Sequence, residues 1–351
     1  MAKRPKPEDI QEVDRLEGFP HPRETFRLVG QEEALGRAAR PIRSGRPPQG
    51  WLIAGPAGIG KATLAYRIAR YLLLYGATDA GPEDLAVAPN DPVSLQVNAG
   101  AHPGLLVLKR GINAKTGKLM TETSVDVVRQ LAGFFGMTSG AGGWRVAIVD
   151  TADDMNPNAA NALLKALEEP PVRSMLMLLS NAPGKLLPTI RSRCQRLDLR
   201  LLGEDMLAKE LAQHLPKMNE GDRSALAKLS DGSLGLALAL SGEDTLALAR
   251  DARRAVDEAA TANVPALLAI ADRVGRSADR LPTFGGFLID ALEQRVIAKA
   301  KAQGAAGLRR WLEAWEQVRA NFDRADALNL EPRQTTVSSV RAIRAAAGRS
   351  A

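Results

Sequence analysis

Short, wholly apolar runs alternate with helical patterns in the first half of the chain. The runs cover 51–54, 146–149 and 175–179, and each is followed at once by a glycine or a polar residue. A strand without polar side chains is buried on both faces, which is typical of a parallel sheet between two layers of helices. The alternation therefore predicts an α/β core over about residues 25–200.

Between the first and second of these runs the pattern changes several times. Residues 76–101 are rich in Gly, Ala, Asp and Pro, and their lack of periodicity predicts an irregular excursion. Residues 105–108 predict another short buried strand, whereas the polar, glycine-bearing residues 109–123 indicate a hairpin or a loop. Apolar residues then recur at helical spacing, which predicts an amphipathic helix over 124–136.

The pattern becomes wholly helical after about residue 203. We expect an α/β domain over 1–202, a small helical domain over 203–244 and a larger helical domain over 245–351. One apolar stripe in the last domain is expected in a helix-bundle core, with a partner-binding face as the alternative: Leu308, Trp311, Leu312, Trp315, Val318 and Phe322.

The composition fits a soluble protein of two or three globular domains. The 351 residues are 45% hydrophobic and 25% charged. No apolar run approaches the ~20 residues of a membrane span, and the polar N-terminus lacks the apolar segment of a secretion signal. The single cysteine, Cys194, excludes an internal disulfide and a multi-cysteine zinc site. We therefore expect a cytoplasmic protein.

The charge is basic, with a formal net value of +7. A nucleic-acid neighbour would explain it, and a soluble basic surface would explain it equally well. Aromatic residues make up only 4% of the chain, and none gathers with arginines into a platform for stacking single-stranded bases. Contact with DNA is therefore expected to be indirect or through backbone phosphates.

A glycine-rich segment joins the first apolar run to a helical pattern, and it reads GPAGIGK over 55–61. In a strand–loop–helix order, glycines let backbone N–H groups surround a phosphate, and the helix N-terminus adds its positive dipole end. Lys61 would reach the outer phosphates. The predicted nucleotide-binding residues are Gly55, Gly58, Ile59, Gly60, Lys61, Ala62, Thr63, Asp150 and Asn181.

Several positions around this loop lack the side chain that hydrolysis needs. Ala62 stands where a Ser or Thr hydroxyl would hold Mg²⁺, and Thr63 is turned by about 100° around the helix. Asp150 ends its strand where a Mg²⁺ ligand belongs, but the next residue, Thr151, cannot act as a general base. Asn181 either orients water or forms a plain turn. The loop predicts ATP held without turnover and without proper Mg²⁺, or a loop that keeps its shape without ligand.

Charged residues after the second and third strands have local interpretations. Asp153 and Asp154 are expected to cap the helix that follows them. Arg193 ends a short predicted helix, from which it could point toward the nucleotide of an adjoining subunit. A guanidinium supplied in trans neutralises charge in a phosphoryl-transfer transition state. A surface arginine is usually only solvated, so this role depends on context.

Two motifs supply that context. Residues 161–171 read NALLKALEEPP, and residues 189–194 read TIRSRC. Together they resemble the clamp-loader branch of the AAA+ ATPases, and the likeness runs over about 28–340. The triplet Ser192-Arg193-Cys194 matches the arginine-finger motif of that family residue by residue.

The resemblance implies an AAA+ P-loop core with a parallel sheet, a small helical lid and a C-terminal helical collar through which subunits oligomerise. It implies a ring that uses ATP to open a sliding clamp and place it on primed DNA, with delta and tau/gamma subunits as partners and no membrane. Within that ring the chain resembles the rigid, non-motor member. Such a member donates its finger, here Arg193, to the neighbouring ATPase subunit and hydrolyses little or no ATP itself.

The chain departs from the motor subunits of that family at Ala62, Thr151 and Gly235, where they carry Ser or Thr, Glu and Arg. An autonomous ATPase motor of the tau/gamma kind, which is the alternative, would need all three of these side chains. A small-molecule kinase is disfavoured by the long helical C-terminus. Many relatives carry a four-cysteine zinc module within 76–101, where this chain has no cysteine, so we expect no zinc and a structural role for His102.

Overall fold

The computed structural model describes most of the chain. The described residues are 15–16, 18–111, 120–136, 143–261, 264–277, 280–303, 308–328 and 330–348. They fall into two compact units, Met1–Leu238 and Ala239–Ala351. Most of the hairpin or loop expected over 109–123 lies outside the described residues.

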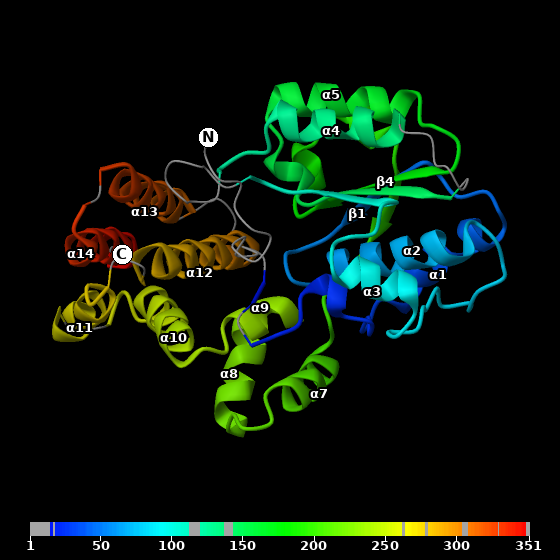
Figure 1. Cartoon of the computed structure of the whole chain (residues 1–351). Helices are drawn as coiled ribbons and strands as arrows, with labels where there is room; N and C mark the ends of the chain where they lie inside the picture. Colours follow the sequence, from blue (N-terminus) through cyan, green and yellow to red (C-terminus); the bar gives the residue numbers. More distant parts are fainter. Residues whose placement is uncertain are drawn as a thin grey trace, which may run out of the picture. The chain divides into compact units, whose positions relative to one another are not determined.

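A five-stranded parallel sheet forms the centre of the first unit (Figure 1). Its strands lie in the order β2-β3-β4-β1-β5, and every pairing between neighbours is parallel. The three apolar runs form β1, β3 and β4, which confirms the expected α/β core. The strands are β1 (Gly50–Ala54), β2 (Leu105–Leu108), β3 (Arg145–Val149), β4 (Ser174–Ser180) and β5 (Gln195–Asp198).

Helices cover both faces of the sheet. One layer holds α1 (Glu32–Arg43), α2 (Lys61–Tyr75) and α3 (Pro92–Asn98); the other holds α4 (Val125–Gly136), α5 (Pro157–Glu168) and α6 (Pro188–Arg191). Along β1, Trp51 and Ile53 pack toward the first layer and Leu52 toward the second, because successive side chains of a strand alternate. Figure 1 shows α2 and α5 on opposite sides of β1 and β4. Short 3₁₀ helices are η2 (Pro22–Glu24), η3 (Ala152–Asp154) and η4 (Pro183–Lys185).

The segment 76–101 is not wholly irregular, because α3 interrupts it. The Asp91 side chain accepts a hydrogen bond from the N–H of Val93 at 2.8 Å, and Pro92 occupies the first helical position. Val97 is fully buried against the α2 layer. An N-cap and a leading proline favour a helix start even where apolar periodicity is weak. The expectation of irregular structure is therefore wrong for 92–98.

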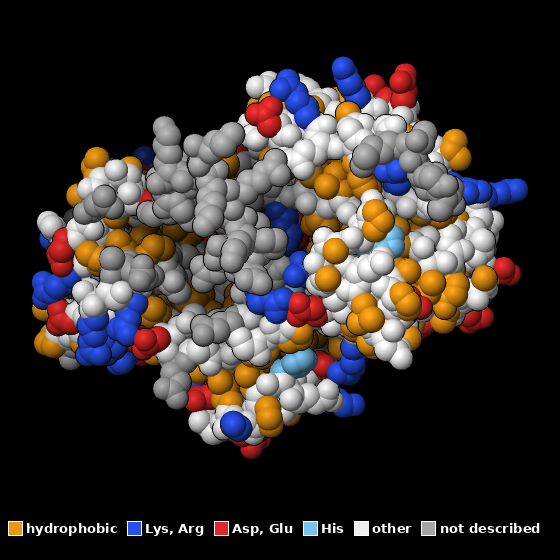
Figure 2. All heavy atoms as spheres, in the orientation of Figure 1, with side chains coloured by type: hydrophobic (Ala, Val, Ile, Leu, Met, Phe, Trp, Pro, Cys, Tyr) orange, Lys and Arg blue, Asp and Glu red, His pale blue; other side chains and the backbone are white. Residues whose placement is uncertain are grey.

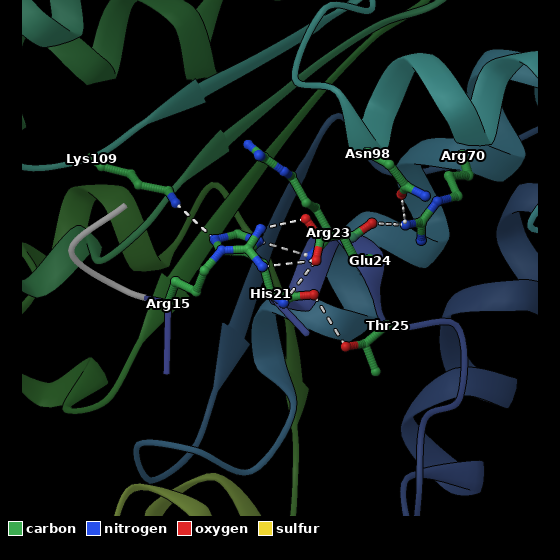
Figure 3. A network of polar contacts seen from close by, with 8 residues as sticks. All are labelled: Arg15, His21, Arg23, Glu24, Thr25, Arg70, Asn98 and Lys109. Atoms are coloured by element: carbon green, nitrogen blue, oxygen red, sulfur yellow. Dashed lines mark hydrogen bonds and ion pairs between the residues drawn. The ribbon is translucent and has the colours of Figure 1, made fainter. Parts of the chain in front are cut away.

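A polar network joins the N-terminal segment to the core (Figure 3). This segment, here called the lead-in, consists of the described residues that precede α1. His21, which is 1% exposed, accepts at Nδ1 from the N–H of Arg23 at 3.1 Å, and Glu24 accepts from the N–H of His21 at 3.2 Å. Arg70 on α2 is 2% exposed and donates to the Arg23 carbonyl and, at 3.0 Å, to Asn98 on α3. These contacts hold the lead-in against the second half of α2 and against α3.

Three helices follow β5, namely α7 (Glu204–His214), α8 (Glu220–Ser230) and α9 (Leu234–Ala239). Residues up to Leu238 cluster with the α/β core in the first unit. Arg27 of the lead-in donates to both carboxylate oxygens of Glu210 on α7, at 2.7 and 2.8 Å, and the Glu210 side chain is 1% exposed. The division into three domains remains a prediction.

The second unit consists of helices in its described part. They are α10 (Glu243–Asp257), α11 (Val264–Val274), α12 (Arg280–Gln303), α13 (Leu308–Leu328) and α14 (Pro332–Ala347). Trp311 and Val318 of the predicted stripe are buried in its core, with Trp315 and Phe322 packed against it, whereas Leu312 is 40% exposed. The stripe therefore belongs to the core at four of its six positions, whereas Leu312 is exposed and Leu308 is half-buried outside the cluster. None of the described helices combines the length and the hydropathy that a membrane crossing requires.

Candidate functional site

The glycine-rich segment forms a loop between β1 and α2, at the place the sequence predicts. β1 ends at Ala54 and α2 begins at Lys61. Gly55, Gly58 and Gly60 have φ angles of 144°, 76° and 100°, which residues with a Cβ atom rarely adopt. The loop therefore makes the sharp backbone turns that the phosphate-binding prediction requires.

Lys61 is folded back onto this loop. Its Nζ donates to the carbonyl oxygens of Gly55 and Pro56, at 2.7 and 2.6 Å, and to Oδ1 of Asn181 at 2.7 Å. Asn181 reaches Lys61 because β4 lies beside β1, with Ser180 opposite Ala54. The structure thus brings together the predicted lysine and amide, and a phosphate would have to replace these oxygens as the acceptor of the lysine.

Two carboxylates that follow β3 act on the charge of Lys61. Burial lowers the pKa of Lys61 to about 8, and the negative charges of Asp150 and Asp153 oppose that shift. Asp153 also accepts hydrogen bonds from Ser180 Oγ at 2.6 Å and from the N–H groups of Asn181 and Ala182. Asp153 therefore fixes the end of β4 and presents Asn181 to Lys61.

Neither Asp153 nor Asp154 caps α5, so that expectation is wrong. The cap is Asn156, whose Oδ1 accepts from the N–H of Ala159 at 2.9 Å. Asp154 pairs with Arg110 at 3.0 Å. Sequence reasoning missed the contact of Asp153 with β4, because the two partners lie 27 residues apart and no local pattern links them.

The turn before α9 and the first residues of α9 dock on the phosphate loop. Ser233 Oγ donates to the carbonyl of Ala57 at 2.8 Å, and the N–H of Gly235 donates to the carbonyl of Gly58 at 2.8 Å. A Cβ atom on Gly235 would lie 2.7 Å from the Cα of Gly58. Gly235 is the position at which the resemblance leads us to expect an arginine in motor subunits, and the backbone of Gly58 leaves no room for a side chain there in this arrangement.

A cavity of about 430 Å³ lies between the lead-in and α7. Its lining includes Arg27, Leu28, Met206 and Glu210. Leu28 also borders the phosphate loop, because a Cβ atom on Gly60 would lie 3.1 Å from Leu28 Cδ1. The cavity and the loop are therefore neighbours, an arrangement that sequence reasoning did not anticipate, since their residues come from three separate segments.

Arg193 lies at the opposite end of the sheet from the phosphate loop. Its carbonyl oxygen is 3.3 Å from the position of a Cβ atom on Gly50, the first residue of β1. The Arg193 Nη2 pairs with Glu168 Oε1 at 2.8 Å, and Nη1 donates to the Thr189 carbonyl at 3.0 Å. The side chain remains 38% exposed. Arg193 is therefore at the surface, as expected, but its guanidinium rests on its own chain.

Comparison with known proteins places the chain among replication subunits. The family described as DNA polymerase III, delta subunit matches residues 30–203. The DNA polymerase III subunit delta' of Pseudomonas aeruginosa is 39% identical over 194 residues, covering 55% of this chain and 56% of that protein. The delta' subunit of Escherichia coli is 31% identical over 259 residues, covering 72% of each chain. This chain belongs to the DNA polymerase III delta-prime family.

The matched region covers only part of each relative. The chain spans little more than half of the Pseudomonas delta-prime subunit that it matches. It is also similar to DNA polymerase III subunit gamma/tau of Mycobacterium bovis, with 32% identity over 183 residues, 50% of this chain and 28% of that protein. The family match over 30–203 contains the phosphate loop and Arg193 but not Gly235.

The structure shows the surroundings of Ala62 and Thr151, the positions at which we expect a Mg²⁺ site to be incomplete. Ala62 offers a methyl group at the first turn of α2, and the Thr151 hydroxyl donates to Asp150 Oδ1 at 3.3 Å. Within the described part of the chain, no group of three or more His, Cys, Asp or Glu side chains could hold a metal ion. His102 has a structural contact, because its Nδ1 accepts from the N–H of Gly104 at 3.0 Å.

Charges are dispersed over the molecular face that Figure 2 shows, with basic and acidic side chains interspersed. Several exposed arginines pair with carboxylates of the same chain, including Arg196 with Asp198 at 2.7 Å and Arg200 with Glu33 at 3.1 Å. These ion pairs compensate part of the exposed positive charge within the chain itself.

Proposed function

We propose that this chain acts as the delta-prime subunit of a DNA polymerase III clamp loader, which helps to load a sliding clamp on primed DNA during replication. Its partners are delta and tau/gamma subunits, and it meets the clamp and DNA through the complex, in the cytoplasm. Membership of the delta-prime family supports the subunit role. The similarity to a gamma/tau subunit is consistent with the proposal that this chain acts in a DNA polymerase III assembly.

The position of Arg193 carries the proposal that it serves a neighbour as an arginine finger. Arg193 lies beside Gly50, whereas the phosphate loop follows Ala54 at the other end of β1. At about 3.3 Å per residue, the ends of that strand are ~13 Å apart, and the loop begins beyond the far end. Arg193 is therefore far from its own loop and open to a phosphate bound by an adjoining subunit, where its charge stabilises phosphoryl transfer.

Weak or absent hydrolysis follows from the chain's own loop. Ala62 and Thr151 supply neither the metal-holding hydroxyl nor the general base. Gly58 is covered by the backbone of Gly235, and Lys61 is satisfied by oxygens of its own chain. We propose that any ATP held here binds without turnover, with its phosphates on Gly55–Lys61 and its base toward the cavity beside Leu28. Such binding requires α9 to move off Gly58.

Substitution of Arg193 tests the central proposal. In a ring reconstituted with its delta and tau/gamma partners, Arg193→Ala should reduce DNA-stimulated ATP hydrolysis and clamp loading. Loss of a finger arginine costs on the order of 10³–10⁵ in the rate of one site in related systems. Arg191→Ala, two residues away and also exposed, is the matched control and should retain activity. Equal activity of both variants and the wild type would reject the finger role.

An autonomous ATPase motor is the second candidate, because the matched half of the chain is also similar to gamma/tau. Steady-state hydrolysis by the purified chain distinguishes the two. We expect no turnover above the level of Lys61→Ala, a variant that removes the phosphate-binding ammonium. Turnover near 1–100 s⁻¹ that Lys61→Ala abolishes would favour the motor.

A further inference from the structure

Arg193 is held by two contacts that belong to its own chain. One is the ion pair with Glu168, at 2.8 Å, and the other is the hydrogen bond to the Thr189 carbonyl, at 3.0 Å. Glu168 is the last residue of α5, and the preceding Leu167 packs on the start of β1, as does the carbonyl of Arg193. The small residue Gly50 lets both segments approach the strand, because a Cβ atom there would lie 2.9 Å from Leu167 Cδ2.

The two contacts use both terminal nitrogens of the guanidinium. Arginine binds phosphate best through the same planar fork of N–H donors, two at a time. While Nη2 faces a carboxylate, part of the positive charge is compensated and one side of the fork is occupied. The Glu168 carboxylate and a phosphate of a neighbouring subunit therefore compete for one group.

In this competition for the Arg193 guanidinium, a neighbour's triphosphate is favoured over Glu168. Both side chains of the pair are partly exposed, at 38% and 47%, and an exposed pair of this kind shifts an equilibrium by only about 1.5- to 5-fold. A triphosphate enclosed between two subunits carries more charge and is less screened than Glu168. It can therefore draw the guanidinium away, while Glu168 retains the guanidinium when no triphosphate is present.

Resting on the proposed finger role, we propose that Glu168 is a positioning residue that holds Arg193 against its own subunit until a neighbour's triphosphate displaces it. The pair thereby makes engagement of the finger depend on the nucleotide state of the next site. Glu168 also keeps an exposed arginine from binding other anions between loading cycles.

The test compares Glu168→Gln with Glu169→Gln in the fully reconstituted ring. Both changes remove one carboxylate at the end of α5 and preserve side-chain length, but Glu168 alone of the two is the Arg193 partner that the structure shows. We expect Glu168→Gln to raise kcat/KM for ATP by about 1.5- to 5-fold at low salt. The gain should shrink at high salt, where the wild-type pair is already screened. Glu169→Gln should match the wild type.

A second pair of variants separates this inference from the finger role itself. In the Arg193→Ala background, Glu168→Gln should have no further effect, because the two act through one contact. If Arg193→Ala lowers hydrolysis and Glu168→Gln leaves or lowers it in the wild-type background, Glu168 has no holding role and only this inference is rejected. If Arg193→Ala changes nothing, the finger role fails first. Unchanged thermal unfolding of Glu168→Gln excludes an effect through stability.

Discussion

Lys61 occupies the position of a phosphate-binding lysine, but its ammonium group donates its hydrogen bonds to oxygens of its own chain. It is 8% exposed, and three oxygens of its own chain accept from its ammonium group. Burial of a cation is unfavourable unless such partners replace water. Burial lowers the pKa of Lys61 to about 8, because the loss of water around the ammonium outweighs the attraction of Asp150 and Asp153. Burial of the charged Lys61 side chain is therefore unfavourable for folding, and we expect a bound phosphate to offset this unfavourable free energy.

This penalty predicts a pH dependence of stability. The pKa of Lys61 falls from 10.5 to about 8 on folding, so between these values the unfolded chain binds a proton that the folded chain has lost. The free energy of unfolding attributable to Lys61 should then rise with pH across that window and be lowest below pH 8. The shift corresponds to roughly 3 kcal/mol at most.

Urea unfolding of the wild type and Lys61→Met at pH 7.5 and pH 10 measures this contribution. The difference between the two proteins should move in favour of the wild type as the pH rises. Lys165→Met, on the exposed face of α5, should show no such drift. Parallel pH profiles for the wild type and Lys61→Met would contradict the prediction.

At the scale of elements, α9 and the phosphate loop are joined by hydrogen bonds to the loop's backbone, one from the Ser233 side chain and one from the backbone of Gly235. The carbonyls of Ala57 and Gly58 accept from Ser233 and Gly235, which precede or begin α9. Gly58 has a φ of 76°, and a Cβ atom on it would lie 2.6 Å from Ser233 Oγ. Glycine at both 58 and 235 is what permits the contact.

Gly235→Ala should therefore separate α9 from the loop. The added methyl group meets the backbone of Gly58, and overpacking of this kind costs about 1–3 kcal/mol. Hydrogen exchange of peptides covering 55–61 and 233–238 should become roughly 5- to 100-fold faster. Gly203→Ala, where nothing lies within 4 Å of the added atom, is the control and should exchange as the wild type does. Unchanged protection in Gly235→Ala would show that the backbone contact does not hold α9.

At the scale of the whole molecule, the chain has two units with separate hydrophobic cores. The two clusters that flank the sheet draw only on residues up to Leu199, and the helical cluster draws only on residues from Leu248 onward. Removal of one unit therefore leaves the core of the other intact. The assembly role that we propose for the second unit can therefore be tested apart from the first unit.

Deletion of residues 239–351 should accordingly abolish assembly without unfolding the first unit. Native mass spectrometry of mixtures with delta and tau/gamma subunits should show complexes for the full chain and none for the truncated chain. Circular dichroism should show a cooperative thermal transition for the truncated chain. If the truncated chain assembles as well as the full one, the collar role of the second unit is wrong.

Some elements were predictable from the sequence and others were not, for reasons specific to each. The strands β1, β3 and β4 were predictable because continuous apolar runs have few other solutions in a soluble chain. The helix α3 was missed because its start depends on the cap at Asp91 and on Pro92, not on periodicity. Leu312 was misassigned because a helical stripe is wider than the face that its neighbours actually cover.

The sequence by itself determined the order of the main strands and helices along the chain, the glycine-rich loop, and the residues Ala62, Thr151 and Gly235 at positions where a motor subunit is expected to differ. These features are local, since each depends on a few neighbouring residues and the backbone conformations they allow. Only the tertiary structure decided that Lys61 meets Asn181, that Gly235 covers Gly58, and that Glu168 pairs with Arg193. Those contacts join residues 25 to 177 positions apart (193 − 168 and 235 − 58), and their formation depends on how strands and helices pack rather than on any local pattern.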